Sequence, residues 1–182
     1  LQRMNPELHL QVSLDDRIAD LVTEGVDVAL RLSAEPPQAH AARVLARIET
    51  PLFAAPSFPP VESVYALAAL PHVRFSGIPP DAPLRLVSDD ETIDIAVNTV
   101  FRANTSNALL QALEAGMGIG GMQLPLAARA LQTGTLVQVL PAWRLPDRFL
   151  YAVYPDARFI PHRVRSVVGV IEQLLPEIIK KN

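Results

Sequence analysis

The sequence predicts an α/β fold of two lobes, with the first lobe completed by the last segment of the chain. Three observations predict it. Segments with period-two apolar alternation are followed by stretches with helical spacing, which is the pattern of β–α–β units. The middle of the chain contains a β-hairpin pattern, and a strand and a long amphipathic helix come last. The 182 residues, 49% of them hydrophobic, suffice for one large core or two small ones.

The composition excludes several classes of protein. The net charge of −3 argues against a bare DNA-binding domain, which usually carries a basic face. The chain has no cysteine, so disulfides and thiolate chemistry are excluded. No apolar run approaches the roughly 18 residues that a membrane span needs. We therefore expect neither direct nucleic-acid binding nor a membrane contact.

The first third of the chain shows the pattern of a β–α–β unit. Apolar and polar residues alternate over residues 8–14, which predicts a strand. Asp15 and Asp16 are suited to cap a helix that extends through Thr23. Gly25 then ends the helix, and residues 26–32 form the next strand. Short connections in this order predict that the two strands are parallel.

The next segments are shorter and are separated by proline-rich connections. The predicted elements are a loop over 33–42, an apolar strand over 43–55 that Pro51 breaks, a short helix over 61–70, a strand over 72–76, and a hairpin of 84–88 with 92–97 around the turn at Asp89, Asp90 and Glu91.

The stretch from Arg102 to Leu126 is the most informative part of the sequence. Polar residues suited to a helix N-cap open it: Asn104, Thr105 and Ser106. A run of good helix formers comes next, Gly116 provides the C-cap, and residues 119–124 form a short strand. The N-terminus of a helix favours anionic groups. The glycines come after the helix, whereas in the dinucleotide-binding fingerprint they open one, so that fingerprint is excluded.

The C-terminal third returns to regular alternation. It predicts a helix over 126–131 that Gly134 ends, a strand over 136–141, a linker over 142–148 and a strand over 149–155. Pro161 suits the first turn of a final helix. The apolar stripe of that helix consists of Val164, Val167, Val168, Ile171 and Leu175.

No constellation of residues indicates catalysis, a metal or a cofactor. The histidines are isolated and lack the spacing of metal ligands: His9, His40, His72 and His162. The acidic cluster lies in the predicted hairpin turn, where such residues are usually solvated. No nucleophile-elbow or phosphate-loop sequence occurs. The sequence therefore predicts a protein that is not an enzyme and that uses no cofactor.

Taken together, the segments resemble the effector-binding domain of LysR-type transcriptional regulators. The resemblance is carried by DDRIADLVTEGVDVALRL, FAAPSF, LAALPHVRF, RANTSNALLQALEAGMGIGGMQLPLAARALQTGTLVQVLPAW and LYAVYPDARFIPHRVRSVVGVI. It implies a fold similar to type 2 periplasmic binding proteins, with two Rossmann-like lobes joined by hinge strands. Residues 1–51 and 150–182 would form the first lobe and residues 52–149 the second. A departure is Gly169, where relatives often carry an acid.

The resemblance also implies which residues line an effector site between the lobes. These are Asp16, Arg17, Leu32, Ser33, Asn104, Thr105 and Ser106. For the last three, an ordinary helix cap is an equally good interpretation, and Arg17 also fits a solvated helix position. Carboxyl ends of strands are where open α/β sheets bind ligands, which supports the same placement.

The resemblance further implies the setting of the domain. A small effector, which could be an anion, would bind between the lobes. The protein would be a cytoplasmic homodimer or homotetramer. It would contact DNA only through an N-terminal winged helix-turn-helix, which this chain lacks. We also expect residues upstream of Leu1, because LQRMNPEL resembles the end of a helix. The alternatives are the solute-binding protein of a transport system and an enzyme on a related scaffold.

Overall fold

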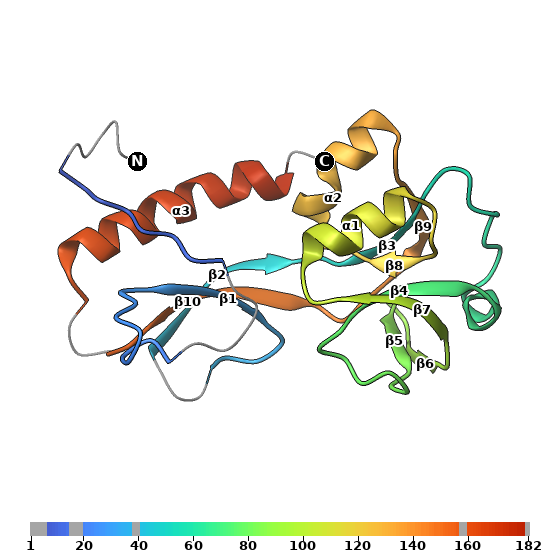
Figure 1. Cartoon of the computed structure of the whole chain (residues 1–182), viewed down its shortest axis with the longest axis horizontal. Helices are drawn as coiled ribbons and strands as arrows, with labels where there is room; N and C mark the ends of the chain where they lie inside the picture. Colours follow the sequence, from blue (N-terminus) through green and yellow to red (C-terminus); the bar gives the residue numbers. More distant parts are fainter. Residues whose placement is uncertain (1–6, 15–19, 38–40, 157–159, 181–182) are drawn as a thin grey trace. The chain divides into compact units, whose positions relative to one another are not determined.

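The computed structural model describes residues 7–14, 20–37, 41–156 and 160–180. These residues form two compact units (Figure 1). The first unit contains the chain up to Arg47 together with Arg148–Lys180, and the second contains Ile48–Asp147. The chain thus crosses between the units a few residues before the boundaries at 51 and 149 that the sequence predicts.

The first unit is a three-stranded sheet covered by one long helix (Figure 1). Its strands, in spatial order, are β1 (Ala29–Ser33), β10 (Arg148–Tyr154) and β2 (Ala41–Ile48). The helix is α3 (His162–Lys180). Strand β1 runs antiparallel to β10, with Ala29 opposite Val153. The central position of β10 explains why its last four residues are buried.

Helix α3 buries most of the stripe that the sequence predicts, with Val167 and Ile171 half-buried. Val164, Val168 and Leu175 are buried, and the first two pack on Ala152 and Tyr154 of β10. The carbonyl of Pro161 accepts hydrogen bonds from the backbone N–H groups of Val164 and Arg165, so the proline stands just before the first turn. A second proline, Pro176, lies inside the helix near its end. The prediction of the final helix is therefore confirmed.

The predicted N-terminal β–α–β unit is wrong in the described residues. Residues 8–14 are not assigned to a strand, and Leu10, Val12 and Leu14 are exposed. Alternation defines a strand only where a neighbouring strand takes its hydrogen bonds, and no described strand pairs with this segment. Strand β1 begins at Ala29 and pairs antiparallel with β10, not parallel with residues 8–14.

The helix expected to end at Thr23 is described only from Asp20 onward, and there it is a set of turns. Asp15 and Asp16, the predicted caps, lie outside the described residues. Instead, the carboxylate of Asp20 accepts from the backbone N–H groups of Val22 and Thr23. Gly25 ends the turns as predicted, with φ +64°.

The second unit contains a five-stranded sheet and a separate parallel pair. In spatial order, the sheet consists of β6 (Thr92–Ile95), β5 (Leu84–Val87), β9 (Val137–Arg144), β3 (Pro51–Ala54) and β8 (Gly120–Gly121). The parallel pair is β4 (Pro71–Phe75) with β7 (Asn98–Ala103). The helices are η1 (Val64–Ala69, a 3₁₀ helix), α1 (Ser106–Glu114) and α2 (Leu124–Thr133).

Strand β3 connects the two cores of this unit. Neighbouring side chains of a strand point to opposite faces, and both Leu52 and Phe53 are fully buried. Phe53 packs with residues of α1 and α2, including Leu113 and Ala127. Leu52 packs with Leu67 of η1 and residues of the β5–β6 hairpin. This two-sided burial is why a strand of four residues is stable between β9 and β8 in the sheet.

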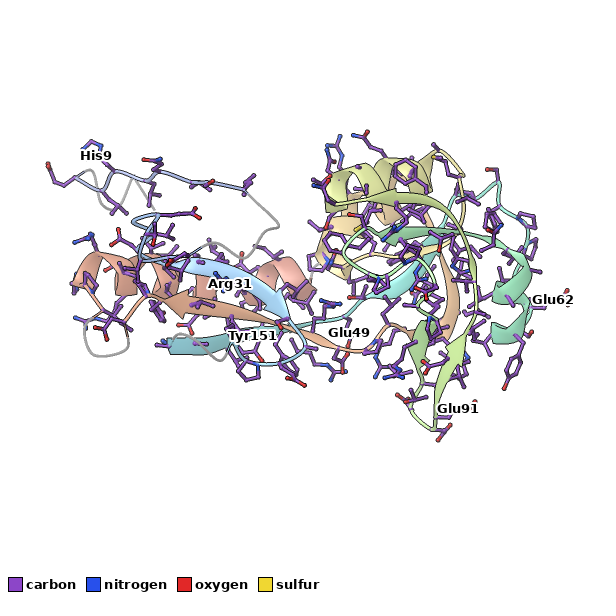
Figure 2. The ribbon with its side chains drawn as sticks, turned by 60° about the horizontal axis from the view of Figure 1, so that its bottom comes forward. His9, Arg31, Glu49, Glu62, Glu91 and Tyr151 are labelled. Atoms are coloured by element: carbon purple, nitrogen blue, oxygen red, sulfur yellow. The ribbon has the colours of Figure 1, made fainter. Side chains whose placement is uncertain are left out.

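Several predictions in this unit are confirmed and two need correction. The hairpin pairs Leu84 with Ile95 and Val87 with Thr92, and Figure 2 shows Glu91 at its outward tip. The strand expected over 119–124 shrinks to β8, because Leu124 and Pro125 already belong to the first turn of α2. Strand β9 continues to Arg144, into the segment predicted as a linker.

His72 in β4 is fully buried, and its protonation makes the stability of the second unit depend on pH. Its Nε2 lies 2.9 Å from the carbonyl oxygen of Leu67, while Nδ1 has no partner among the described residues. Burial lowers the pKa of His72 below its ordinary value of 6.5; the hydrogen bond to Leu67 opposes this shift, and the charge of Arg74 adds to it. The folded chain therefore keeps this imidazole neutral at a pH where the unfolded chain protonates it.

We predict that the free energy of unfolding of the second unit falls as the pH is lowered below 6.5. When the unfolded chain binds one more proton than the folded chain, the free energy of unfolding changes by at most about 1.4 kcal/mol per pH unit. The variant His72→Gln should show a smaller slope. Urea titrations between about pH 7.5 and 5.5, followed by the fluorescence of Trp143, the chain's single tryptophan, would measure both slopes. Equal slopes would contradict the prediction.

Candidate functional site

The parallel strands β4 and β7 end at the same edge of the second unit. Phe75, the last residue of β4, pairs with Ala103, the last residue of β7. The backbone N–H of Ser76 donates to the carbonyl of Ala103 (2.8 Å), which ties the two exits together. Helix α1 begins three residues after Ala103, so its N-terminus lies at this edge. Such edges are where open α/β sheets hold ligands.

The N-terminus of α1 has the geometry of a capped helix. Thr105 is the N-cap, with extended backbone angles (φ −125°, ψ 139°), and its Oγ1 accepts from the N–H of Ala108 at 3.4 Å. Asn104 and Thr105 are exposed, and Ser106 is half-buried. Because the remaining N–H groups of a first turn have no partner inside the helix, they are available to an anion.

Two arginines stand side by side at the same edge. Arg74 and Arg102 are register partners on β4 and β7, one residue before the end of each strand. Burial is the main cause that lowers the pKa of the Arg74 guanidinium, and the neighbouring charge of Arg102 lowers it further. Two like charges this close raise the local positive potential. Val73 and Ala103, their neighbours in the two strands, pack toward α1, so the arginine side chains extend from the other face of the strand pair.

The arginines also fix the loop after β4. Arg74 donates through Nη1 to the carbonyl of Ala82 (2.7 Å) and through Nη2 to that of Pro83 (3.3 Å). Arg102 donates through Nη2 to the carbonyls of Ser76 and Ile78. All four acceptors are neutral carbonyl oxygens, so the bonds position the loop without cancelling either charge.

Glycines allow the segment after α1 to return against β4. Gly116 has φ +73°, the left-handed conformation of a helix C-cap. A Cβ on Gly118 would lie 2.5 Å from the carbonyl oxygen of Pro71, and one on Gly120 would lie 2.5 Å from that of Val73. These glycines are therefore explained by a turn and a close backbone approach, and they take no part in the edge described above.

The structure places the predicted site residues in two groups. Asn104, Thr105 and Ser106 lie together at the α1 N-terminus, in the second unit. Leu32 and Ser33 lie at the end of β1, in the first unit, opposite Leu150 and Phe149 of β10. The Oγ of Ser33 accepts from the N–H of Glu35 at 3.3 Å, which shapes the turn after β1. Asp16 and Arg17 lie outside the described residues.

Sequence reasoning missed Arg74, Arg102 and Ser76. A signal was present, because each arginine interrupts an apolar strand one residue before its end, in VRF and FRA. Within the described residues, no group of three or more histidines and acids could hold a metal ion. No described helix combines the length and the apolar character of a membrane span.

Comparison with known proteins identifies a family. The family described as "LysR substrate binding domain" matches residues 1–176. The chain is 30% identical over 182 residues to the HTH-type transcriptional regulator PtxR of Pseudomonas aeruginosa. That match covers 95% of this chain but 57% of PtxR, so the chain spans little more than half the length of this relative.

Solved structures show the same fold. The regulatory domain of CrgA from Neisseria meningitidis superposes with a TM-score of 0.80 at 19% identity, over 96% of this chain and 87% of that one. The effector domain of AmpR from Pseudomonas aeruginosa gives 0.79 at 17% identity, over 98% and 87%. The architecture is therefore the α/β fold of these regulatory domains, similar to type 2 periplasmic binding proteins, as the sequence predicts.

We predict that Arg102→Ala loosens the loop over residues 76–83 while the second unit stays folded. The change removes the two hydrogen bonds to Ser76 and Ile78, so amide hydrogen exchange in the loop should accelerate by about tenfold or more. Hydrogen-exchange mass spectrometry would measure it. Arg85→Ala, which breaks the exposed pair with Asp94, is the matched control and should leave this loop unchanged. Equal exchange in both variants would refute the assigned role.

Proposed function

Because the chain belongs to the LysR substrate-binding domain family, a family of transcriptional regulators and not of enzymes, we propose that it senses a small anionic effector at the N-terminus of α1. The observation that carries the proposal is the capped N-terminus of α1 at the edge where β4 and β7 end, with the positive charges of Arg74 and Arg102 one residue before the ends of the same strands. Helix amides and guanidinium groups are the donors that recognise carboxylates and phosphates.

Asn104, Thr105 and Ser106 have separate roles in this proposal. The Thr105 Oγ1 acts as acceptor for Ala108, so its hydroxyl proton is still available to a ligand oxygen. Ser106 contributes its backbone N–H and hydroxyl, and Asn104 contributes an exposed amide at the rim. The positive edge attracts the anion, and these neutral donors then fix its orientation.

The effector would act by joining the two units. In the proposal it also contacts the turn after β1, where Leu32 and Ser33 lie, and Asp16 and Arg17 would complete that side. A ligand bound by both units favours the arrangement in which both sets of contacts are made. It shifts the equilibrium only by its difference in affinity between the arrangements.

In the whole protein this shift would control transcription. The relatives are named as HTH-type regulators, and this chain covers 57% of PtxR, so we propose that a DNA-binding part accompanies it in the cytoplasm. A homodimer or homotetramer would carry the signal, since soluble homo-oligomers are mostly two-fold symmetric. Family membership favours this interpretation over the solute-binding protein of a transport system.

The test is calorimetric titration of the chain with a panel of small carboxylates. For a carboxylate that binds, the double variant Asn104→Ala, Thr105→Val should lower the affinity by about tenfold or more, since hydrogen bonds to a charged ligand are lost. Thr133→Val is the control: its hydroxyl bonds back to the carbonyls of Arg129 and Ala130 in α2, so the affinity should not change. An affinity unaffected by the double variant would place the effector elsewhere.

A further inference from the structure

Arg74 is a buried charge that no described acid neutralises. The residue is 7% exposed, and an arginine keeps its proton inside a protein. Buried charges are ordinarily paired with an opposite charge, because an unpaired one has lost its hydration without compensation. Burial is the main cause that lowers the pKa of Arg74, the charge of Arg102 adds to it, and no described carboxylate acts in the other direction. The described part of the chain therefore does not itself supply the counter-charge.

Arg102 adds a second positive charge beside the first. It is exposed and is the register partner of Arg74. The loop over residues 76–83 contains one acid, Asp81, which is exposed and makes no ion pair with either arginine among the described residues. Two adjacent guanidinium groups thus share a region in which only neutral carbonyl oxygens meet them, so their charge is available to an anion.

The two guanidinium groups keep donors that the loop does not use. Arg74 donates through Nη1 and Nη2 to the carbonyls of Ala82 and Pro83, whereas its Nε is buried and has no partner among the described residues. Arg102 donates to the loop through Nη2, which leaves Nε and Nη1 on an exposed side chain. The planar fork of a guanidinium binds two oxygens of an oxyanion side by side. Arg102 can therefore hold an oxyanion without giving up the loop.

These donors lie on the face of the β4–β7 pair that is turned away from α1. The neighbouring residues Val73 and Ala103 pack toward the helix, so the arginine side chains extend from the other face. Figure 1 shows α1 on one side of the pair and the β5–β6 hairpin on the other. A ligand on the arginine face is thus separated by the strands themselves from a ligand at the α1 N-terminus.

From these observations, we propose that Arg74 and Arg102 form a second binding site of this unit, specific for a doubly charged phosphate group. Two fixed positive charges match the two negative charges of the group, and the guanidinium fork fits its oxygens. The phosphate binds to the exposed donors of Arg102 and neutralises the charge of Arg74 behind it. Inorganic phosphate and a phosphomonoester both present this group. The site does not rest on the proposed effector, because it needs no contact with the α1 N-terminus.

The test uses the full 182-residue chain and inorganic phosphate as the probe, at about pH 8, where a phosphate carries close to two negative charges. Nuclear magnetic resonance titration reports the affinity and the responding groups. We expect shifts of the Nε–H signals of Arg74 and Arg102. Acetate at the same ionic strength is the singly charged counterpart and should bind about tenfold more weakly or less.

Phenyl phosphate identifies the source of the phosphate group. If it binds more tightly than inorganic phosphate at the same arginine signals, the site serves a phosphorylated metabolite. If inorganic phosphate binds at least as tightly, the free anion is the ligand. Both results support a phosphate site, whereas a chain that binds neither compound, or binds acetate as tightly as both, overturns the proposal.

Two arginine variants show whether the charge pair is responsible. Arg102→Gln removes the exposed donors and should lower the affinity for inorganic phosphate by about tenfold or more. Arg85→Gln is the matched control, because the Arg85 guanidinium is already held by the carboxylate of Asp94 through hydrogen bonds of 2.8 and 2.7 Å, and its affinity should not change. Equal affinities in the two variants would overturn the proposal.

Two further variants guard the test. Arg102→Lys keeps the charge without the planar fork and should bind phosphate with intermediate affinity. The double variant Asn104→Ala, Thr105→Val should bind phosphate as the unchanged chain does, which distinguishes this site from the effector site. Should Arg102→Gln fail to fold, the unchanged chain still decides: phosphate that leaves both arginine Nε–H signals in place overturns the proposal.

Discussion

The parallel pairing of β4 and β7 is the constraint on which the second unit depends. Parallel strands need a crossover between them, and the chain uses the β5–β6 hairpin for that connection. Because the pair is in register up to Phe75 and Ala103, both exits and the N-terminus of α1 are brought to one edge. Helix α1 then packs its buried side, including Leu109 and Leu113, toward Val73 and Phe53. Loss of this pairing would separate the arginines, the loop and the helix cap at once.

The elements that sequence predicts well are those decided by local chemistry. The Thr105 cap, the left-handed glycines at 116 and 134, the β5–β6 hairpin and the stripe of α3 each depend on residues close in the chain. The wrong predictions concern elements that form only when a partner strand lies beside them. Residues 8–14 have the alternation of a strand, but in the described part of the chain no neighbouring strand accepts them. Alternation reports which face a side chain would take, not whether a partner exists.

The candidate site was likewise predictable only in the part that depends on residues close in the chain. The helix N-terminus was visible because capping residues precede helix formers over a few positions. Arg74 and Arg102 were not, because their meaning comes from a register between strands that are distant in sequence and from carbonyls in a third segment.

Pro176 has a consequence for how the final helix comes apart. A proline has no N–H, so the carbonyl of Glu172 loses the donor that would normally stand four residues later. The hydrogen-bond ladder of α3 is therefore interrupted near its end, and the residues beyond the proline can fray without disturbing those before it. The Arg43–Glu172 pair lies on the near side of the interruption and holds the longer part of the helix to β2. Opening of the carboxyl-terminal turn is thus uncoupled from the sheet.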